Sequence, residues 1–188
     1  MNFEGPSVLL VGLMGTGKST IARQLSTRLD IECLDTDRMI EARTHRTVRE
    51  IFAEDGESTF REIESEVLGE CLGRQVPCVI AGAGGIVVRE ENRHIINSAR
   101  HDGRTIVVWL TAEPKVLVTR TSKGNHRPLL DDDKEGTLTR LAQERSSMYG
   151  EVADVIVDVG QRSVESTVNL LVDVLNEDIA ERKQGNGK

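Results

Sequence analysis

One eight-residue segment constrains the fold of this chain more than any other part of the sequence. Residues 12–19 read Gly-Leu-Met-Gly-Thr-Gly-Lys-Ser and fit the pattern G-x-x-x-x-G-K-[ST] at every position. An apolar run at Ser7–Val11 precedes the segment, and a helical pattern over Lys18–Leu29 follows it. Glycines let such a loop turn tightly around phosphates, and the N-terminus of the next helix attracts the anion. The segment predicts a strand, a phosphate loop and a helix, with Lys18 at the β- and γ-phosphates and Ser19 on Mg²⁺.

Short β-branched runs alternate with helical patterns, which is typical of a parallel α/β sheet. We expect strands at residues 7–11, 31–34, 76–81, 105–110 and 155–159, and helices at 18–29, 90–99, 113–121, 138–149 and 164–175. Residues 38–72 hold no strand candidate and are rich in charge, which indicates helices, broken near 44–47 and at Gly56, inserted over the mouth of the sheet. Residues 121–136 are polar and contain Gly and Asp, a composition that is typical of mobile loops.

The expected fold is therefore an α/β three-layer sandwich with a five-stranded parallel sheet. It forms a single domain over residues 1–178, with an acceptor-binding insertion at 38–66, a mobile lid at 121–136 and a polar tail at 179–188. We expect the chain to fray from Ala180 onward, because its last residues are polar.

Charge and composition exclude several kinds of partner. A net charge of −7 and an aromatic content of 3% argue against a nucleic-acid surface, which needs basic and stacking side chains. No apolar run approaches the roughly 20 residues that span a bilayer, so we expect no membrane association. The three cysteines match no zinc pattern and predict free thiols in a reducing cytoplasm. We expect a cytoplasmic monomer.

Three classes of phosphate-loop protein compete at this point. A GTPase needs a guanine-reading Asn-Lys-x-Asp segment, and the sequence has none. A motor ATPase usually shows four apolar residues that end in Asp, whereas the apolar runs here end in Gly (Val79 to Gly82) or Thr (Val107 to Thr111). A small-molecule kinase remains, and the sequence offers it two carboxylates at the end of the second strand.

These carboxylates are Asp35 and Asp37. Ligands of open α/β sheets bind at the carboxyl ends of the strands, so both side chains should lie near the phosphate loop. Asp35 is closer to the strand end and suits the Mg²⁺ shell, while Asp37 can accept a hydroxyl proton from the acceptor. The alternative for Asp37 is a helix N-cap before Arg38.

The sequence resembles the shikimate kinases, within the nucleoside-monophosphate kinase-like group of P-loop kinases. The resemblance runs in order from Val8 to about Leu175. After the phosphate loop, its motifs are Asp35-Thr36-Asp37, Glu50-Ile51-Phe52, Gly56-Glu57, Phe60-Arg61-x-x-Glu64, Gly84-Gly85, Arg127-Pro128-Leu129-Leu130, Arg145 with Tyr149, and Val152-Ala153-Asp154. The Phe-Arg-x-x-Glu and Arg-Pro-Leu-Leu segments are specific in combination.

The resemblance implies ATP-dependent phosphorylation of the 3-hydroxyl of shikimate, with Mg²⁺ as cofactor and ATP and shikimate as substrates. It implies that ATP binds at Gly15, Thr16, Gly17, Lys18, Ser19, Thr20, Arg120, Arg127 and Arg162. Shikimate would bind at Asp37, Arg61, Gly84, Gly85 and Arg145, with the two arginines on its carboxylate and both glycines offering backbone N–H groups. Lys18, Asp37 and Arg127 would be the catalytic residues, and Ser19 and Asp35 the metal ligands.

Several alternatives stay open. Arg61 and Glu64 are three residues apart and could form only a surface ion pair on a helix, and Arg145 could lie on a solvated helix face. The family usually has three glycines where this chain has Ala83-Gly84-Gly85, and it often has Gly where this chain has His45. The acceptor could instead be another hydroxy acid such as gluconate, or the chain could bind nucleotide without turnover.

Overall fold

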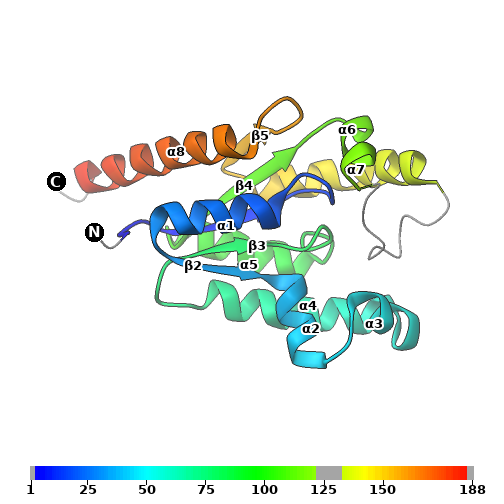
Figure 1. Cartoon of the computed structure of the whole chain (residues 1–188). Coiled ribbons are helices and arrows are strands. Elements are labelled where there is room, and N and C mark those ends of the chain that lie inside the picture. The colour runs from blue at the N-terminus through cyan, green and yellow to red at the C-terminus, as the bar shows by residue number, and fades with distance from the viewer. Residues whose placement is uncertain (1–2, 122–132, 186–188) are drawn as a thin grey trace.

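The computed structural model describes residues 3–121 and 133–185 and shows an α/β fold with one parallel sheet (Figure 1). The five strands lie in the order β2-β3-β1-β4-β5, and every neighbouring pair is parallel. The strands are β1 (Ser7–Val11), β2 (Glu32–Asp35), β3 (Cys78–Ala81), β4 (Thr105–Thr111) and β5 (Val155–Asp158). The helices are α1 (Lys18–Leu29), α2 (Thr36–Thr44), α3 (Val48–Glu54), α4 (Gly56–Leu72), α5 (Glu90–His101), α6 (Pro114–Thr121), α7 (Lys134–Val152) and α8 (Val164–Gly185). The predicted fold class is confirmed.

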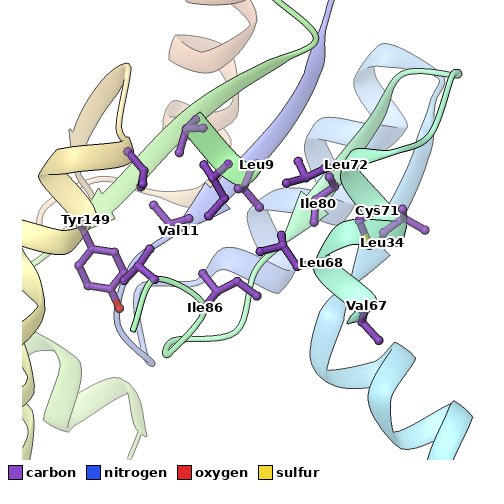
Figure 2. Packing of buried hydrophobic residues seen from close by; sticks show 14 of the residues in the cluster. Leu9, Val11, Leu34, Val67, Leu68, Cys71, Leu72, Ile80, Ile86 and Tyr149 are labelled. Carbon is purple, nitrogen blue, oxygen red and sulfur yellow. The ribbon is translucent and has the colours of Figure 1, made fainter. Parts of the chain in front are cut away.

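Alternating side chains of the central strands build two cores, one on each face of the sheet. Leu9 and Val11 of β1 belong to the core shared with α4, α5 and α7, part of which Figure 2 shows. Val8 and Leu10 belong to the core shared with α1 and α8. A strand with helices on both faces has no polar side, which explains the fully apolar sequence of β1 after Ser7.

The predicted insertion is a group of three packed helices. Its breaks lie where the sequence indicates: His45 ends α2 in a left-handed conformation with φ of 54°, and α4 begins at Gly56. Thr47 and Glu50 form a capping box at the start of α3. The Phe52 and Phe60 rings, 4.6 Å apart between centroids, join α3 to α4. The C-terminal part of α4 continues past the predicted insertion and packs against the sheet near Ile80 (Figure 2).

Several helix ends differ from the expected ranges, most of all the start of α7 and the end of α8. Residues 134–136 were expected in the lid, but they form the first turn of α7, where the Asp133 carboxylate accepts a hydrogen bond from the Gly136 N–H. The tail was expected to fray from Ala180, but α8 continues to Gly185. Residues 122–132 of the predicted lid, which include Arg127, lie outside the described residues.

The remaining expectations concern the membrane and the thiols. Within residues 3–121 and 133–185, no helix has the length and apolar character that crossing a membrane requires. The three cysteines are free thiols, as predicted, and Cys71 and Cys78 are buried. Burial raises the pKa of Cys71 to about 12, which keeps this thiol protonated and poorly reactive.

Candidate active site

The phosphate loop connects β1 to α1 in a conformation that only glycine allows. Gly12 has a φ of 136°, and a Cβ atom there would lie 2.2 Å from the Leu110 carbonyl oxygen. Gly15 has a φ of 86° and packs against α6 at Leu117. Gly17, also at positive φ, is the N-cap of α1 and has no side chain to cover the helix N-terminus. The loop therefore presents backbone and a helix N-terminus to a ligand, as the sequence predicts.

The Lys18 side chain is folded onto this loop. Its Nζ atom donates hydrogen bonds to the carbonyl oxygens of Gly12, at 2.7 Å, and Leu13, at 2.9 Å. The residue is buried and lines the cavity at the carboxyl edge of the sheet. A flexible ammonium with such contacts can transfer part of its hydrogen bonding to phosphate oxygens that enter the loop.

The end of β2 places three polar side chains in succession. Asp35 is the N-cap of α2, and its carboxylate accepts a hydrogen bond from the Arg38 N–H at 3.3 Å. The cap alternative for Asp37 is therefore wrong: Asp37 lies inside the first turn of α2 and lines the cavity. Asp35 lines the same cavity.

Thr36, between the two aspartates, is a residue to which the sequence interpretation gave no role. It is fully buried; its hydroxyl accepts a hydrogen bond from the Ala83 N–H at 2.9 Å and donates to the Ala81 carbonyl at 3.4 Å. It thereby ties the start of α2 to the turn after β3. A hydroxyl between two carboxylates at a strand end was the available signal.

Arg61 is buried in α4, and two glutamates hold its guanidinium. Nη1 donates to both carboxylate oxygens of Glu64, at 2.9 and 3.0 Å, and Nη2 donates to Glu57 at 3.0 Å. Glu64 is fully buried, which raises its pKa to about 6 even though Arg61 lowers it. The ion pair considered from the spacing exists, but it is buried rather than on the surface, and Arg61 also lines the cavity.

The turn after β3 requires glycine at Gly85 and accommodates Ala83. A Cβ atom on Gly85 would lie 2.1 Å from Arg61 Nη1, so the guanidinium occupies the space that a side chain would need. Ala83 does not have a positive φ, so its Cβ atom causes no backbone strain in the turn. The contacts seen at Gly84 are made by its carbonyl oxygen, whereas the sequence interpretation expected backbone N–H groups.

Two side chains of α7 converge on the Gly84 carbonyl. Arg145 Nη1 donates to it at 2.9 Å and the Tyr149 hydroxyl at 2.5 Å. Arg145 is buried, so the solvated-face alternative is wrong. Burial raises the pKa of Tyr149 to about 12, which keeps its hydroxyl a donor.

These groups surround one cavity of about 280 Å³. Of the predicted site residues, the lining includes Gly15, Lys18, Ser19, Asp35, Asp37, Arg61, Gly84, Gly85 and Arg145. It also includes Glu41, Val48, Phe52, Phe60 and Glu64, to which the sequence interpretation gave no binding role. Their signal was the apolar and acidic pattern of the insertion helices, but the pattern alone does not say which face meets the cavity.

The remaining predicted residues lie elsewhere. Thr16, Gly17 and Thr20 belong to the loop and α1 but do not line this cavity, and Thr16 faces a smaller pocket beside Trp109. Arg120, at the end of α6, donates to the carbonyls of Val159 and Gly160, which directly precede the exposed residues 161–163 that include Arg162. The two arginines are thus brought to one region, apart from the cavity lining.

The cavity also offers oxygen donors that suit Mg²⁺. The Ser19 hydroxyl and the Asp35 carboxylate both line it, and hard oxygen ligands are those Mg²⁺ prefers. In the described part of the chain, no group of three or more His, Cys, Asp or Glu side chains could hold a metal by itself. Ser19 and Asp35 together offer two oxygen ligands, and Mg²⁺ commonly takes its other ligands from nucleotide phosphates and water.

Comparison with known proteins shows the family. A sequence model described as shikimate kinase matches residues 14–176. The shikimate kinase of Burkholderia thailandensis is 39% identical over 167 residues, covering 88% of each chain. That of Pseudoalteromonas atlantica is 39% identical over 175 residues, covering 93% of this chain and 99% of the relative.

Solved structures of kinases also resemble this chain. The shikimate kinase from Acinetobacter baumannii in complex with shikimate superposes with a TM-score of 0.87 at 32% identity, covering 94% of this chain and 96% of that chain. A gluconokinase from Sinorhizobium meliloti reaches a TM-score of 0.69 at 20% identity, covering 100% of both chains, and shows likeness of fold alone. The family model matches residues 14–176, a range that includes most of the phosphate loop and both buried arginines of the cavity. This chain therefore belongs to the shikimate kinase family.

Proposed function

We propose that this cavity is the place where the chain phosphorylates the 3-hydroxyl of shikimate with ATP. The observation that carries the proposal is the cavity lining itself, which joins the phosphate loop to the buried guanidinium groups of Arg61 and Arg145 and to Asp37. The acceptor that fits this arrangement carries a carboxylate for the arginines and a hydroxyl for the carboxylate. Shikimate has both groups on one rigid ring.

Arg61 and Arg145 would hold the acceptor carboxylate. They lie on different helices, α4 and α7, and both are buried, which strengthens their attraction for an anion. Arg61 is oriented by its Nη1 hydrogen bonds to both carboxylate oxygens of Glu64. Arg145 is oriented by its Nη1 hydrogen bond to the Gly84 carbonyl oxygen. Guanidiniums that are already oriented lose little conformational freedom on binding.

Asp37 would receive the 3-hydroxyl. Its carboxylate lies on the same cavity as Lys18 and can take the hydroxyl proton while the oxygen attacks the γ-phosphoryl group. Lys18 would stabilise the charge on the transferring group together with Arg127, which lies outside the described residues. Arg120 and Arg162 would flank the adenine.

Ser19 and Asp35 would hold Mg²⁺ with the nucleotide. Bound there, the metal would neutralise phosphate charge, which is its general part in phosphoryl transfer. The chain's own groups do the rest by positioning, because this reaction demands little covalent chemistry of a protein. The monomeric state and the cytoplasmic location stay predictions, and sedimentation analysis would test the first.

A coupled assay of ADP release tests the proposal. We expect Mg²⁺-dependent ADP release with shikimate, little with gluconate, and a low background without acceptor. Turnover with gluconate but not shikimate would support the alternative acceptor. Nucleotide binding without release of ADP under any condition would support a protein that has lost turnover.

A further inference from the structure

Tyr149 has contacts that packing alone does not require. It is the chain's one tyrosine, it is 1% exposed, and it follows Arg145 by one turn of α7. Figure 2 shows its ring at the edge of the core beside Val11. A buried phenol needs a partner for its hydroxyl, and here the partner is a backbone carbonyl of the acceptor cavity.

The Gly84 carbonyl differs from its neighbours in the turn by the hydrogen-bond donors that it accepts from. The carbonyls on either side, of Ala83 and Gly85, accept backbone N–H groups from Ile86 and Val88 at 3.1 and 2.9 Å. The Gly84 carbonyl is instead bonded by two side chains of α7. A carbonyl oxygen has two lone pairs, so both donors can bind it at once. Tyr149 and Arg145 thus determine together how the turn faces the cavity.

Trp109 supports the tyrosine ring from β4. The two rings stack with 5.5 Å between centroids and an interplanar angle of 27°. Trp109 also reaches the phosphate loop, because its Cδ1 atom is 3.5 Å from where a Cβ of Gly12 would be. The ring of Tyr149 is therefore held in place independently of its hydroxyl.

We propose that Tyr149 is a positioning residue for the acceptor: its hydroxyl fixes the Gly84 carbonyl and, through that shared oxygen, the guanidinium of Arg145. The inference rests on the proposed function, since Arg145 is taken to bind the acceptor carboxylate. Without the hydroxyl, the Gly84 carbonyl keeps Arg145 as its side-chain donor and the turn gains freedom to rotate. The acceptor must then order the turn and the arginine when it binds.

The test compares Tyr149→Phe with Ser26→Ala. Both remove a buried hydroxyl that donates to a backbone carbonyl, but Ser26 bonds Arg23 within α1, away from the cavity lining. We expect Tyr149→Phe to raise KM for shikimate roughly two- to tenfold, the equivalent of one buried neutral hydrogen bond, with kcat and KM for ATP nearly unchanged. Ser26→Ala should leave all three constants unchanged. Melting temperatures of both variants measure the purely structural effect.

A double-mutant cycle with Arg145→Lys adds a readout that packing does not affect. If Tyr149 acts through Arg145, its effect on KM for shikimate shrinks in the Arg145→Lys background. An equal effect in both backgrounds, an unchanged KM, or equal rises of both KM values would overturn the proposal.

Calorimetric titration with shikimate separates this inference from the proposed function. Binding without turnover would refute the kinase activity and leave the positioning role to be decided by the Kd of Tyr149→Phe against that of the unmodified chain. Absence of binding to the unmodified chain would refute both.

Discussion

Gly85→Ala tests the site geometry most directly. The new Cβ would lie 2.1 Å from Arg61 Nη1 and 2.5 Å from both Cζ and Nη2. The guanidinium must retreat by roughly 1 Å or more to restore ordinary contact. Displacing an arginine guanidinium usually costs little free energy, because the side chain is flexible. The guanidinium of Arg61, however, donates through Nη1 to Glu64, which is fully buried. Moving the tip therefore weakens a buried ion pair as well as the acceptor contact.

The magnitude follows from that pair. Complete loss of one partner of a buried pair costs about 3–5 kcal/mol, so partial displacement should lower the free energy of unfolding by about 1–3 kcal/mol. KM for shikimate should rise about tenfold or more, because the displaced guanidinium no longer faces the acceptor, whereas KM for ATP should change little. Urea denaturation and steady-state kinetics measure the two effects.

Gly69→Ala is the matched control on α4. A Cβ atom there would have no heavy atom within 4 Å apart from its chain neighbours and the backbone of its own helix, and the variant should stabilise the helix by about 0.5–1 kcal/mol. If Gly85→Ala also keeps full stability and a normal KM for shikimate, then Arg61 tolerates displacement and its close approach to Gly85 is not required for stability or acceptor binding.

The remaining predictions concern a charge, a pKa and a strained residue. Asp37→Asn should lower kcat roughly 10²- to 10⁴-fold if Asp37 accepts the proton, but should chiefly raise KM for shikimate if it only orients the hydroxyl; wild-type constants would refute both roles. The pKa of Glu64 is raised from 4.5 to about 6 in the fold, so the folded state binds more protons and the free energy of unfolding should fall as pH rises through this interval. Urea denaturation between pH 4 and 7 should show this fall, on the order of 2 kcal/mol, relative to Glu64→Gln, and parallel pH profiles would contradict it. His45→Gly should raise the melting temperature through a gain of about 0.5–1 kcal/mol, because His45 has a φ of 54° that glycine adopts without strain. Asp30→Gly, at a φ of 56°, should gain less, because the short polar side chain of Asp can hydrogen-bond locally in the left-handed region.

Much of the fold was predictable because its signals are local. The bounds of β1 and α1 match the predicted ranges, since the phosphate loop marks the end of one and the start of the other. Strand ends elsewhere differ by one or two residues. The end of α8 could not be predicted from polarity, because a helix already anchored by buried residues such as Leu171 and Leu175 can continue through polar residues.

The candidate site also contains residues whose roles a local motif predicts and residues whose roles it does not predict. The roles for Lys18 and Ser19 come from a motif in which neighbours in sequence are neighbours in space, and both residues line the cavity. The roles for Arg61 and Arg145 came from the family resemblance, because single arginines on helices carry no such signal. Their burial and convergence on one cavity were visible only in the structure.

The sequence by itself determined the phosphate loop, the alternation of strands and helices, and the family, because each depends on residues close together along the chain or on a long ordered pattern. Only the tertiary structure decided the strand order β2-β3-β1-β4-β5 and the contacts it creates. It made Asp35 rather than Asp37 the helix cap, it brought Arg61 against Gly85, 24 positions apart in the numbering, and it brought Tyr149 to the Gly84 carbonyl across 65 residues. Such contacts depend on how helices pack over a sheet, and packing is shared among many side chains whose individual preferences leave the partner undetermined.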